Sequence, residues 1–331
     1  MFCPLISLHS LNQTPQPVKP GLRLNKLAAM AAINDHMRIM PIMSQPPDPH
    51  PKSPKLKAPP GACDTHIHIF GPVADYPFHT DAAYHSPDAL PETYVQWQHT
   101  LGLERAVVIH PTALGPGVNA RTLDTLAADP DRYRGVCVPN PDIDTAGLQQ
   151  MHDLGVRGCR FTSVGNYANA PGLNKHLCAR IADFGWHAQF LLEGEQIPEM
   201  QGEIQNLPCD VVIDHMGRVP AHLGINHPAF QTLLRMLDSG KVWVKISGPM
   251  RFSSEDRMPY ADTLPFAHAL VAANPERLVW GSDWPHINYN KGVMPNDADL
   301  LDLLLDWAPD EATRNRILVD NAAKLYDFPA I

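Results

Sequence analysis

The chain has 331 residues, of which 44% are apolar and 18% charged, the balance of a globular protein with a sizeable core. Its net charge of −9 argues against a general affinity for nucleic acid or an anionic membrane, because both require a basic surface. No run approaches the roughly 20 apolar residues of a membrane-spanning helix. The composition therefore predicts a soluble protein that acts on a small molecule.

Residues 1–60 differ in composition from the rest of the chain. They hold 12 of the 34 prolines and seven Lys or Arg, against Asp35 and Asp48 as the only acidic residues. Such a stretch cannot bury enough apolar surface to offset the entropy of ordering, so we expect a disordered extension, with the folded domain at 61–331. A targeting segment is less favoured, because a charged n-region is lacking. A start site placed too early is the other alternative, with Met30, Met37, Met40 and Met43 as candidates.

From residue 61 onward, short β-branched runs alternate with segments of helical periodicity. The expected strands are, in chain order, 62–69, 105–111, 133–139, 156–162, 187–193, 210–215, 242–247 and 278–283. The expected helices lie at 93–103, 119–129, 146–155, 173–185, 199–207, 228–240 and 263–273, and two closing helices lie at 298–308 and 311–328. Eight such units in about 270 residues predict a (β/α)8 TIM barrel, a single α/β domain with its chemistry at the carboxyl ends of the strands. An open doubly wound sheet is less favoured, since no glycine-rich phosphate loop follows the first strand.

The six cysteines form no C-x-x-C pair, and three of them lie in apolar, strand-like runs. A thiol in such a run behaves as a small hydrophobe. We therefore expect reduced, structural cysteines in a cytoplasmic protein. The sequence leaves open whether the chain forms a homo-oligomer.

The first expected strand carries an H-x-H pair at its end. Side chains alternate across a strand, so His66 and His68 should face the same side, together with Asp64. Two imidazoles that converge at the mouth of a barrel act either as metal ligands or as paired hydrogen-bond donors.

The sixth and eighth strands also end in ionisable residues. Asp214 and His215 should point to opposite faces, and we expect His215 to face inward while Asp214 pairs with a neighbouring helix or loop. The run VWGSDWPH delivers Asp283 to the active end, where a carboxylate among imidazoles can serve as a general base. Its alternative role as a helix N-cap is weaker, because residues 285–288 do not begin a helix.

These motifs carry a family resemblance. His66-x-His68, Asp-His-Met-Gly at 214–217 and Gly-Ser-Asp-Trp-Pro-His at 281–286 resemble the amidohydrolase-2 branch of the amidohydrolase superfamily. Within it, the chain is similar to the group of 2-pyrone-4,6-dicarboxylate lactonases and 4-sulfomuconolactone hydrolases over about residues 58–328. The resemblance implies hydrolytic opening of a lactone, with water activated by Asp283 and the carbonyl surrounded by His66, His68 and His215.

The resemblance also implies how substrate is bound. Arg160 and Arg251 would hold a substrate carboxylate, and Tyr84 matches a substrate-contacting tyrosine. The chain departs from the pyrone lactonases at two positions, where Asn166 and Leu191 replace an arginine and a tyrosine. These losses favour a less charged ring than the pyrone dicarboxylate, such as a muconolactone, another pyrone carboxylate or a sugar-acid lactone.

The resemblance implies catalysis without a metal, although many members of the wider superfamily hold one. The alternative is a single Zn²⁺ or Mn²⁺ held by His66, His68, Asp283 and Glu193. His187 lies at the wrong end of its strand to supply the usual further ligand. The alternative functions are a metal-dependent decarboxylase of an aromatic or unsaturated acid, a lactone isomerase and a non-catalytic binding barrel.

Overall fold

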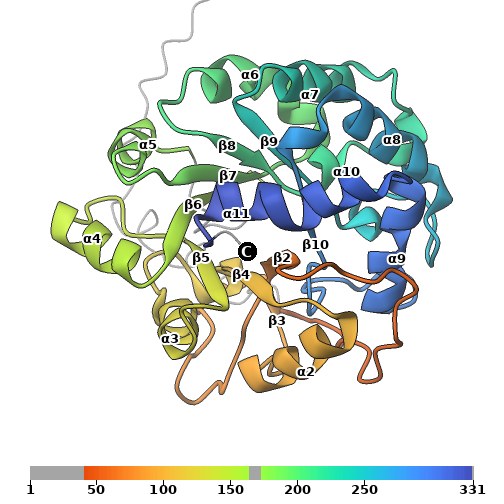
Figure 1. Cartoon of the computed structure of the whole chain (residues 1–331). Helices are drawn as coiled ribbons and strands as arrows, with labels where there is room; N and C mark the ends of the chain where they lie inside the picture. The colour runs from red at the N-terminus through yellow and green to blue at the C-terminus, as the bar shows by residue number, and fades with distance from the viewer. Residues whose placement is uncertain (1–40, 164–172, 330–331) are drawn as a thin grey trace, which may run out of the picture. The chain divides into compact units, whose positions relative to one another are not determined.

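Eight parallel strands form a ring in the computed structural model, which describes residues 41–163 and 173–329 (Figure 1). The hydrogen-bonded order is β10-β9-β8-β7-β6-β5-β4-β2. The bounds of the strands are β2 Cys63–Ile67, β4 Arg105–Ile109, β5 Tyr133–Cys137, β6 Val156–Thr162, β7 His187–Leu191, β8 Val211–Ile213, β9 Val242–Ser247 and β10 Leu278–Gly281. Each lies within an expected strand.

Backbone hydrogen bonds just beyond the end of β10 close the ring against β2. Asp283 N donates to His66 O at 2.9 Å, and His68 N donates to Trp284 O at 2.8 Å. The predicted (β/α)8 barrel is therefore confirmed. Its closure also fixes Asp283 beside the two histidines of the H-x-H pair.

Helices surround the strands in Figure 1. Their bounds are α2 Pro91–Leu101, α3 Ala120–Ala128, α4 Thr145–Asp153, α5 Lys175–Ala182, α6 Ile197–Gln205, α7 Pro228–Asp238, α8 Leu264–Ala273, α9 Asp297–Trp307, α10 Glu311–Asn315 and α11 Asn321–Tyr326. Proline in the first turn begins α2 and α7, and Gly102 ends α2 in the left-handed conformation. These sequence signals place the helices where their periodicity predicts them.

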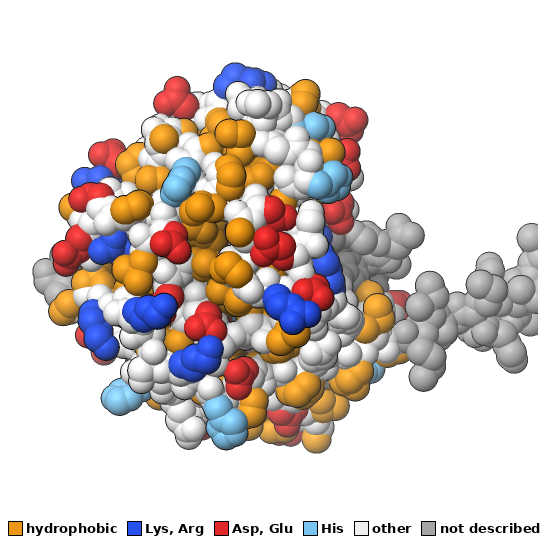
Figure 2. All heavy atoms as spheres, turned by 90° about the vertical axis from the view of Figure 1, so that its right-hand side faces the viewer, with side chains coloured by type: hydrophobic (Ala, Val, Ile, Leu, Met, Phe, Trp, Pro, Cys, Tyr) orange, Lys and Arg blue, Asp and Glu red, His pale blue; other side chains and the backbone are white. Residues whose placement is uncertain are grey.

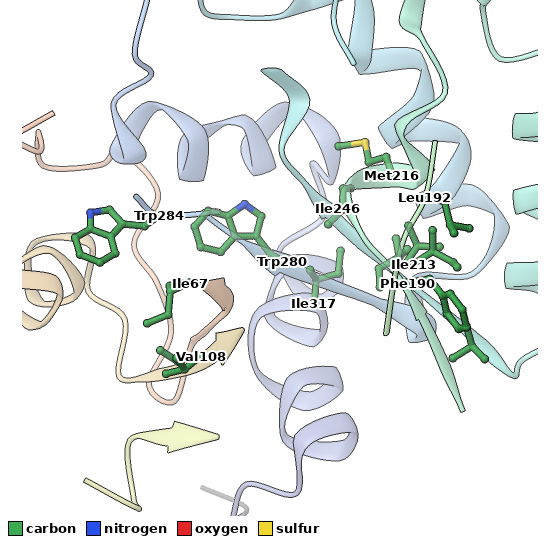
Figure 3. Packing of buried hydrophobic residues seen from close by; sticks show 14 of the residues in the cluster. Ile67, Val108, Phe190, Leu192, Ile213, Met216, Ile246, Trp280, Trp284 and Ile317 are labelled. Atoms are coloured by element: carbon green, nitrogen blue, oxygen red, sulfur yellow. The ribbon is translucent and has the colours of Figure 1, made fainter. Parts of the chain in front are cut away.

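The buried side chains form two clusters, as alternation along a strand requires. Val108, Ile213 and Ile246 belong to the larger cluster, between the strands and the surrounding helices (Figure 3). Apolar side chains at the alternate strand positions face the barrel interior and form the smaller cluster, in which they pack against α11. The members of this cluster are Cys63, Val107, Ile109, Val136, Val212, Trp243, Val279, Ala322, Leu325, Tyr326 and Phe328. The last helix therefore covers the end of the barrel opposite the carboxyl ends of the strands.

Residues 41–60 contact the barrel, whereas composition predicted that the extension continues to residue 60. The strand β1 (Ile42–Met43) pairs with β3 (Tyr84–His85), and the side chain of Leu56 is buried. The backbone N–H of Leu56 donates to Asp302 on α9 at 2.9 Å. Hydrogen bonds to the barrel thus order a proline-rich stretch that has little apolar surface of its own. Residues 1–40 lie outside the described part of the chain.

The surface of the protein carries charges of both signs. Acidic and basic side chains are interspersed on the face shown in Figure 2. Among residues 41–163 and 173–329, each helix is too short or too polar to cross a bilayer. The five described cysteines are buried and free of disulfides, as expected for structural thiols.

Candidate active site

A cavity of about 220 Å³ opens at the carboxyl ends of the strands, where barrel enzymes hold their substrates. A cavity of this size fits a small compound. Six of the seven predicted site residues line it, namely His68, Tyr84, Arg160, His215, Arg251 and Asp283. His66, the seventh, is fully buried and contacts His68 and Asp283.

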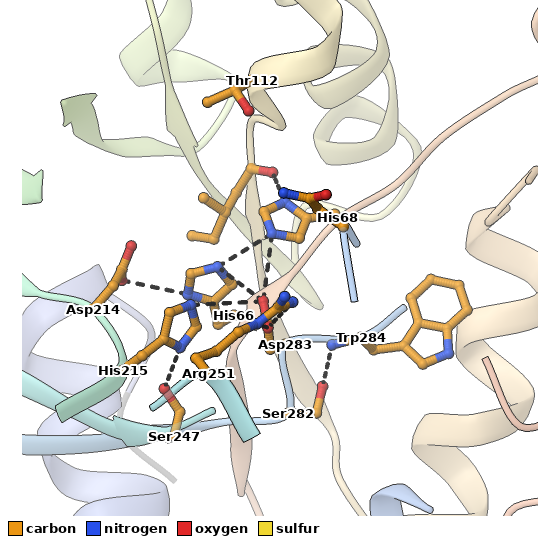
Figure 4. Close-up of polar contacts among 12 residues, drawn as sticks. His66, His68, Thr112, Asp214, His215, Ser247, Arg251, Ser282, Asp283 and Trp284 are labelled. Atoms are coloured by element: carbon orange, nitrogen blue, oxygen red, sulfur yellow. Dashed lines mark hydrogen bonds and ion pairs between the residues drawn. The ribbon is translucent and has the colours of Figure 1, made fainter. Parts of the chain in front are cut away.

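The two histidines of the H-x-H pair meet through their Nε2 atoms, which are 3.3 Å apart (Figure 4). The Nδ1 atom of His68 lies 2.8 Å from the carbonyl oxygen of Ile109. Burial lowers the pKa of both rings, that of His66 well below its usual 6.5. Both imidazoles are therefore held neutral.

Asp64 does not join these histidines, so the prediction that it shares their side of the strand is wrong. Its carboxylate accepts hydrogen bonds from Tyr94 Oη on α2 and from the backbone and hydroxyl of Ser282. The register between β2 and β4 shifts between Asp64 and Ile67, which breaks the simple alternation of side chains.

Asp283 lies at the centre of the polar cluster. Its Oδ1 is 3.6 Å from Nε2 of both His66 and His68, and 3.8 Å from Nε2 of His215 (Figure 4). Its Oδ2 accepts hydrogen bonds from Arg251 Nε at 2.7 Å and Nη2 at 2.5 Å. Burial raises the pKa of this carboxyl, but the Arg251 guanidinium and His215 outweigh that effect and hold it well below 3.8. Asp283 is thus an ionised carboxylate with one oxygen facing the histidines.

His215 follows the short strand β8 and turns into the cavity. Its Nδ1 lies 3.0 Å from Ser247 Oγ, and burial lowers its pKa to about 4. A Cβ at Gly248 would lie only 2.6 Å from that Nδ1, so glycine is needed for this close approach.

Asp214 corrects another expectation, because it pairs inside the barrel rather than with a helix or loop. Its Oδ1 is 3.4 Å from His66 Nδ1, and its Oδ2 accepts from Gln189 Nε2 at 3.1 Å and lies 3.6 Å from Arg160 Nη2. The backbone of His215 has φ of 51°. This left-handed turn breaks the strand alternation, so that both Asp214 and His215 face the interior.

Lys245 is a residue of the site that the sequence analysis missed. It lies on β9 with a fully buried side chain, and its Nζ donates to Thr65 O at 2.8 Å and lies 3.2 Å from His66 Nδ1. The sequence does contain a signal for this residue. Lys245 lies two positions after Trp243 in the apolar strand VWVKIS, so both side chains point to the same side of the strand, into the barrel. A buried charge of this kind is rare unless it is paired.

Arginine side chains give the cavity a positive wall. Arg160 donates from Nη1 to His110 O at 3.2 Å, while its buried Nε has no hydrogen-bond partner among the described residues. Arg218 also lines the cavity, and its Nη2 is 3.7 Å from Glu193 Oε2. Such guanidinium groups suit planar anions.

Of the three remaining predicted positions, two lie at the cavity and one lies outside the described residues. Tyr84 lines the cavity with its hydroxyl 3.5 Å from Thr112 Oγ1, and Leu191 lines it as well. Asn166 lies outside the described residues.

Two groups of side chains bring potential metal-ligand atoms within 4.8 Å of one another. One is His66, His68 and Asp283, and the other is His66, Asp214 and His215. Glu193, the expected fourth ligand, belongs to neither group among the described residues, and its half-exposed carboxylate pairs with Arg218 instead. His187 is distant, as expected, because its ring packs on Tyr326 of α11. Spacing alone therefore permits one ion with three protein ligands.

Comparison with known proteins gives matches over the whole barrel. The sequence model of the amidohydrolase family matches residues 63–328. A 4-sulfomuconolactone hydrolase from Hydrogenophaga intermedia is 35% identical over 285 residues, which cover 85% of this chain and 93% of that protein. A 2-pyrone-4,6-dicarboxylate hydrolase from Comamonas testosteroni is 35% identical over 287 residues, covering 84% and 93%. A crystal structure from Agrobacterium tumefaciens has a TM-score of 0.75 at 27% identity, covering 84% of this chain and 100% of that one.

Proposed function

The chain belongs to the amidohydrolase family, and from that premise we propose that it hydrolyses a lactone of a small, anionic compound. The observation that carries the proposal is the ionised Asp283, which faces three histidines in a cavity rimmed by arginines. The names of the two relatives, both hydrolases of anionic lactones, support the same reaction class.

Asp283 acts as the general base in this proposal. It takes a proton from water while the water oxygen bonds to the lactone carbonyl carbon, and His66, His68 and His215 surround the reacting carbonyl group. The ring C–O bond then breaks, and the departing oxygen takes the proton back. The low pKa that Arg251 imposes on Asp283 makes the unliganded carboxylate a weak base.

An anionic substrate would relieve this constraint. Arg251 is partly exposed to the cavity, with 15% of its side-chain surface accessible, whereas Asp283 is buried. A substrate carboxylate that shares the Arg251 guanidinium would weaken its pairing with Asp283, and the pKa of that carboxyl would rise. Arg160 and Tyr84 would contact the same substrate from β6 and β3.

We propose that the reaction requires no cofactor and takes place in the cytoplasm, where free, buried cysteines such as those described persist. A requirement for a single Zn²⁺ or Mn²⁺ is the opposite outcome. A panel of muconolactones, pyrone carboxylates and sugar-acid lactones, assayed by ring-opening absorbance with and without chelator, tests substrate class and metal requirement together. The absence of turnover on every lactone under both conditions would contradict the proposal.

A further inference from the structure

Lys245 occupies a position that the proposed chemistry does not explain. Its ammonium group lies beneath the catalytic cluster, fully buried, within 3.2 Å of His66 Nδ1 and 3.6 Å of Asp214 Oδ1. We propose that Lys245 is a positioning residue that holds His66 in the tautomer with its proton on Nε2. The catalytic meaning of that tautomer rests on the proposed function, but the tautomer itself does not.

The assignment begins at His68. Its Nδ1 is 2.8 Å from the carbonyl oxygen of Ile109, which can only accept a hydrogen bond, so Nδ1 carries a proton. A neutral imidazole has one N–H, and burial disfavours a second proton on this ring. The Nε2 atom of His68 therefore presents a lone pair.

The proton of His66 follows from that lone pair. Its Nε2 faces His68 Nε2 at 3.3 Å and the carboxylate Oδ1 of Asp283 at 3.6 Å, and both are acceptors. A lone pair on His66 Nε2 would place three acceptors against one another in a buried site. A proton there makes His66 the donor and leaves its Nδ1 as an acceptor.

Lys245 is the donor that this Nδ1 requires. An ammonium group has three N–H donors and no acceptor, so at 3.2 Å it bonds Nδ1 only when Nδ1 is unprotonated. Asp214 Oδ1, at 3.4 Å, favours the opposite tautomer, with a proton on Nδ1. The same oxygen is also paired with Lys245 and does not depend on the ring for a partner.

This tautomer distinguishes a hydrogen-bond donor from a metal ligand. With its proton on Nε2, His66 can donate to a carbonyl or oxyanion, but it has no lone pair for an ion shared with His68 and Asp283. The spacing of the three groups fits a metal, and so does the lone pair of His68, whereas the proton on His66 Nε2 does not. Moving the proton of His66 to Nδ1, toward Asp214, would restore that lone pair, and Lys245 opposes this move.

The direct test is NMR of the full chain with ¹⁵N-labelled histidine, in which two-bond proton–nitrogen correlations identify the tautomer of each ring. The signals of His66 are assigned by their loss in His66→Gln. We expect an Nε2–H pattern in the wild type, an Nδ1–H pattern in Lys245→Met, and an unchanged pattern in Asp214→Asn. Lys241→Met, which removes a lysine just before β9 that bonds Gln205 O, is the matched control and should also leave the pattern unchanged.

Binding of Co²⁺ gives a second readout that does not depend on turnover. Mutation of a residue that hydrogen-bonds to a metal ligand changes the metal affinity by about 10–100-fold. We therefore expect Lys245→Met to bind Co²⁺ more tightly than the wild type by a similar factor. An Nδ1–H or doubly protonated His66 in the wild type would overturn the proposal, and so would an unchanged tautomer in Lys245→Met. If Lys245→Met does not fold, the wild-type spectrum still tests the proposal, because an Nδ1–H pattern there would mean that Asp214, and not Lys245, determines the position of the proton. None of these results depends on whether a lactone is the substrate.

Discussion

Replacing Arg251 with methionine tests the link between substrate charge and the catalytic carboxylate. Arg251 directs two N–H groups at Asp283 Oδ2 and lines the cavity, so it can also meet a substrate carboxylate. A hydrogen bond to a charged group contributes about 1.5–3 kcal/mol. Because about 1.4 kcal/mol is a factor of ten, KM for an anionic lactone should rise roughly 10- to 150-fold in Arg251→Met.

The same substitution should change the pH dependence of the reaction. The pKa of Asp283 is held below 3.8 in part by the Arg251 guanidinium, so losing that cation raises it. A general base acts in its ionised form, and its rate falls as pH drops through its pKa. The acid limb of the kcat/KM profile should therefore move to higher pH in Arg251→Met.

Steady-state kinetics on a carboxylated lactone and on its neutral methyl ester would separate the two effects. Only the anionic compound should show the increase in KM, while both should show the displaced acid limb. Arg257→Met is the matched control, because Arg257 is exposed and pairs with Asp256. An unchanged KM for the anionic lactone would remove Arg251 from substrate binding and refute the reasoning.

Three further predictions concern the base, the metal and the buried histidines. Asp283→Asn should lower kcat about 10²- to 10⁴-fold, and a loss below tenfold would exclude Asp283 as the base. Exhaustive dialysis against chelator should leave the rate unchanged, whereas activity that disappears and returns with Zn²⁺ would contradict the cofactor-free proposal. Burial lowers the pKa of His187 to about 3, below its usual 6.5, so the unfolded chain binds the extra proton between these values. This histidine should therefore cost about 1.4 kcal/mol of unfolding free energy per pH unit as pH falls from 6.5, which urea denaturation of the wild type and of His187→Gln at pH 7 and pH 5 would measure as a difference.

The barrel could be predicted because its signals are local. Each strand is a short apolar run and each helix carries an apolar stripe, and the strictly alternating order leaves few architectures. Chemistry in such a barrel lies at the carboxyl ends of strands, so the same reasoning indicated His68 and Asp283, while the family resemblance added Arg160, and all three line one cavity. The order of residues 41–60 was not predicted, because it depends on contacts with α9 and β3 that composition does not encode.

The parts of the site that were mispredicted depend on departures from regular strand geometry. The register shift in β2 turns Asp64 toward α2, and the left-handed backbone at His215 brings Asp214 into the barrel. Neither departure has a signature in a single sequence, since left-handed conformations are rare for residues other than glycine. Lys245 is a different case, because strand alternation already predicts that its side chain points into the barrel. Only its hydrogen-bond partners could not be predicted from the sequence.

Closure of the barrel is the step that brings these groups together, which explains why residues far apart in sequence form one site. The bonds Asp283 N to His66 O and His68 N to Trp284 O are also the bonds that join the last strand to the first. Asp283 has φ of 69°, a conformation that costs free energy and persists only where surrounding contacts impose it. A barrel that has not closed lacks these contacts, so it would hold neither the strained backbone of Asp283 nor its position beside the histidines. Catalytic competence should consequently appear together with the final β2–β10 pairing and not with the formation of individual βα units.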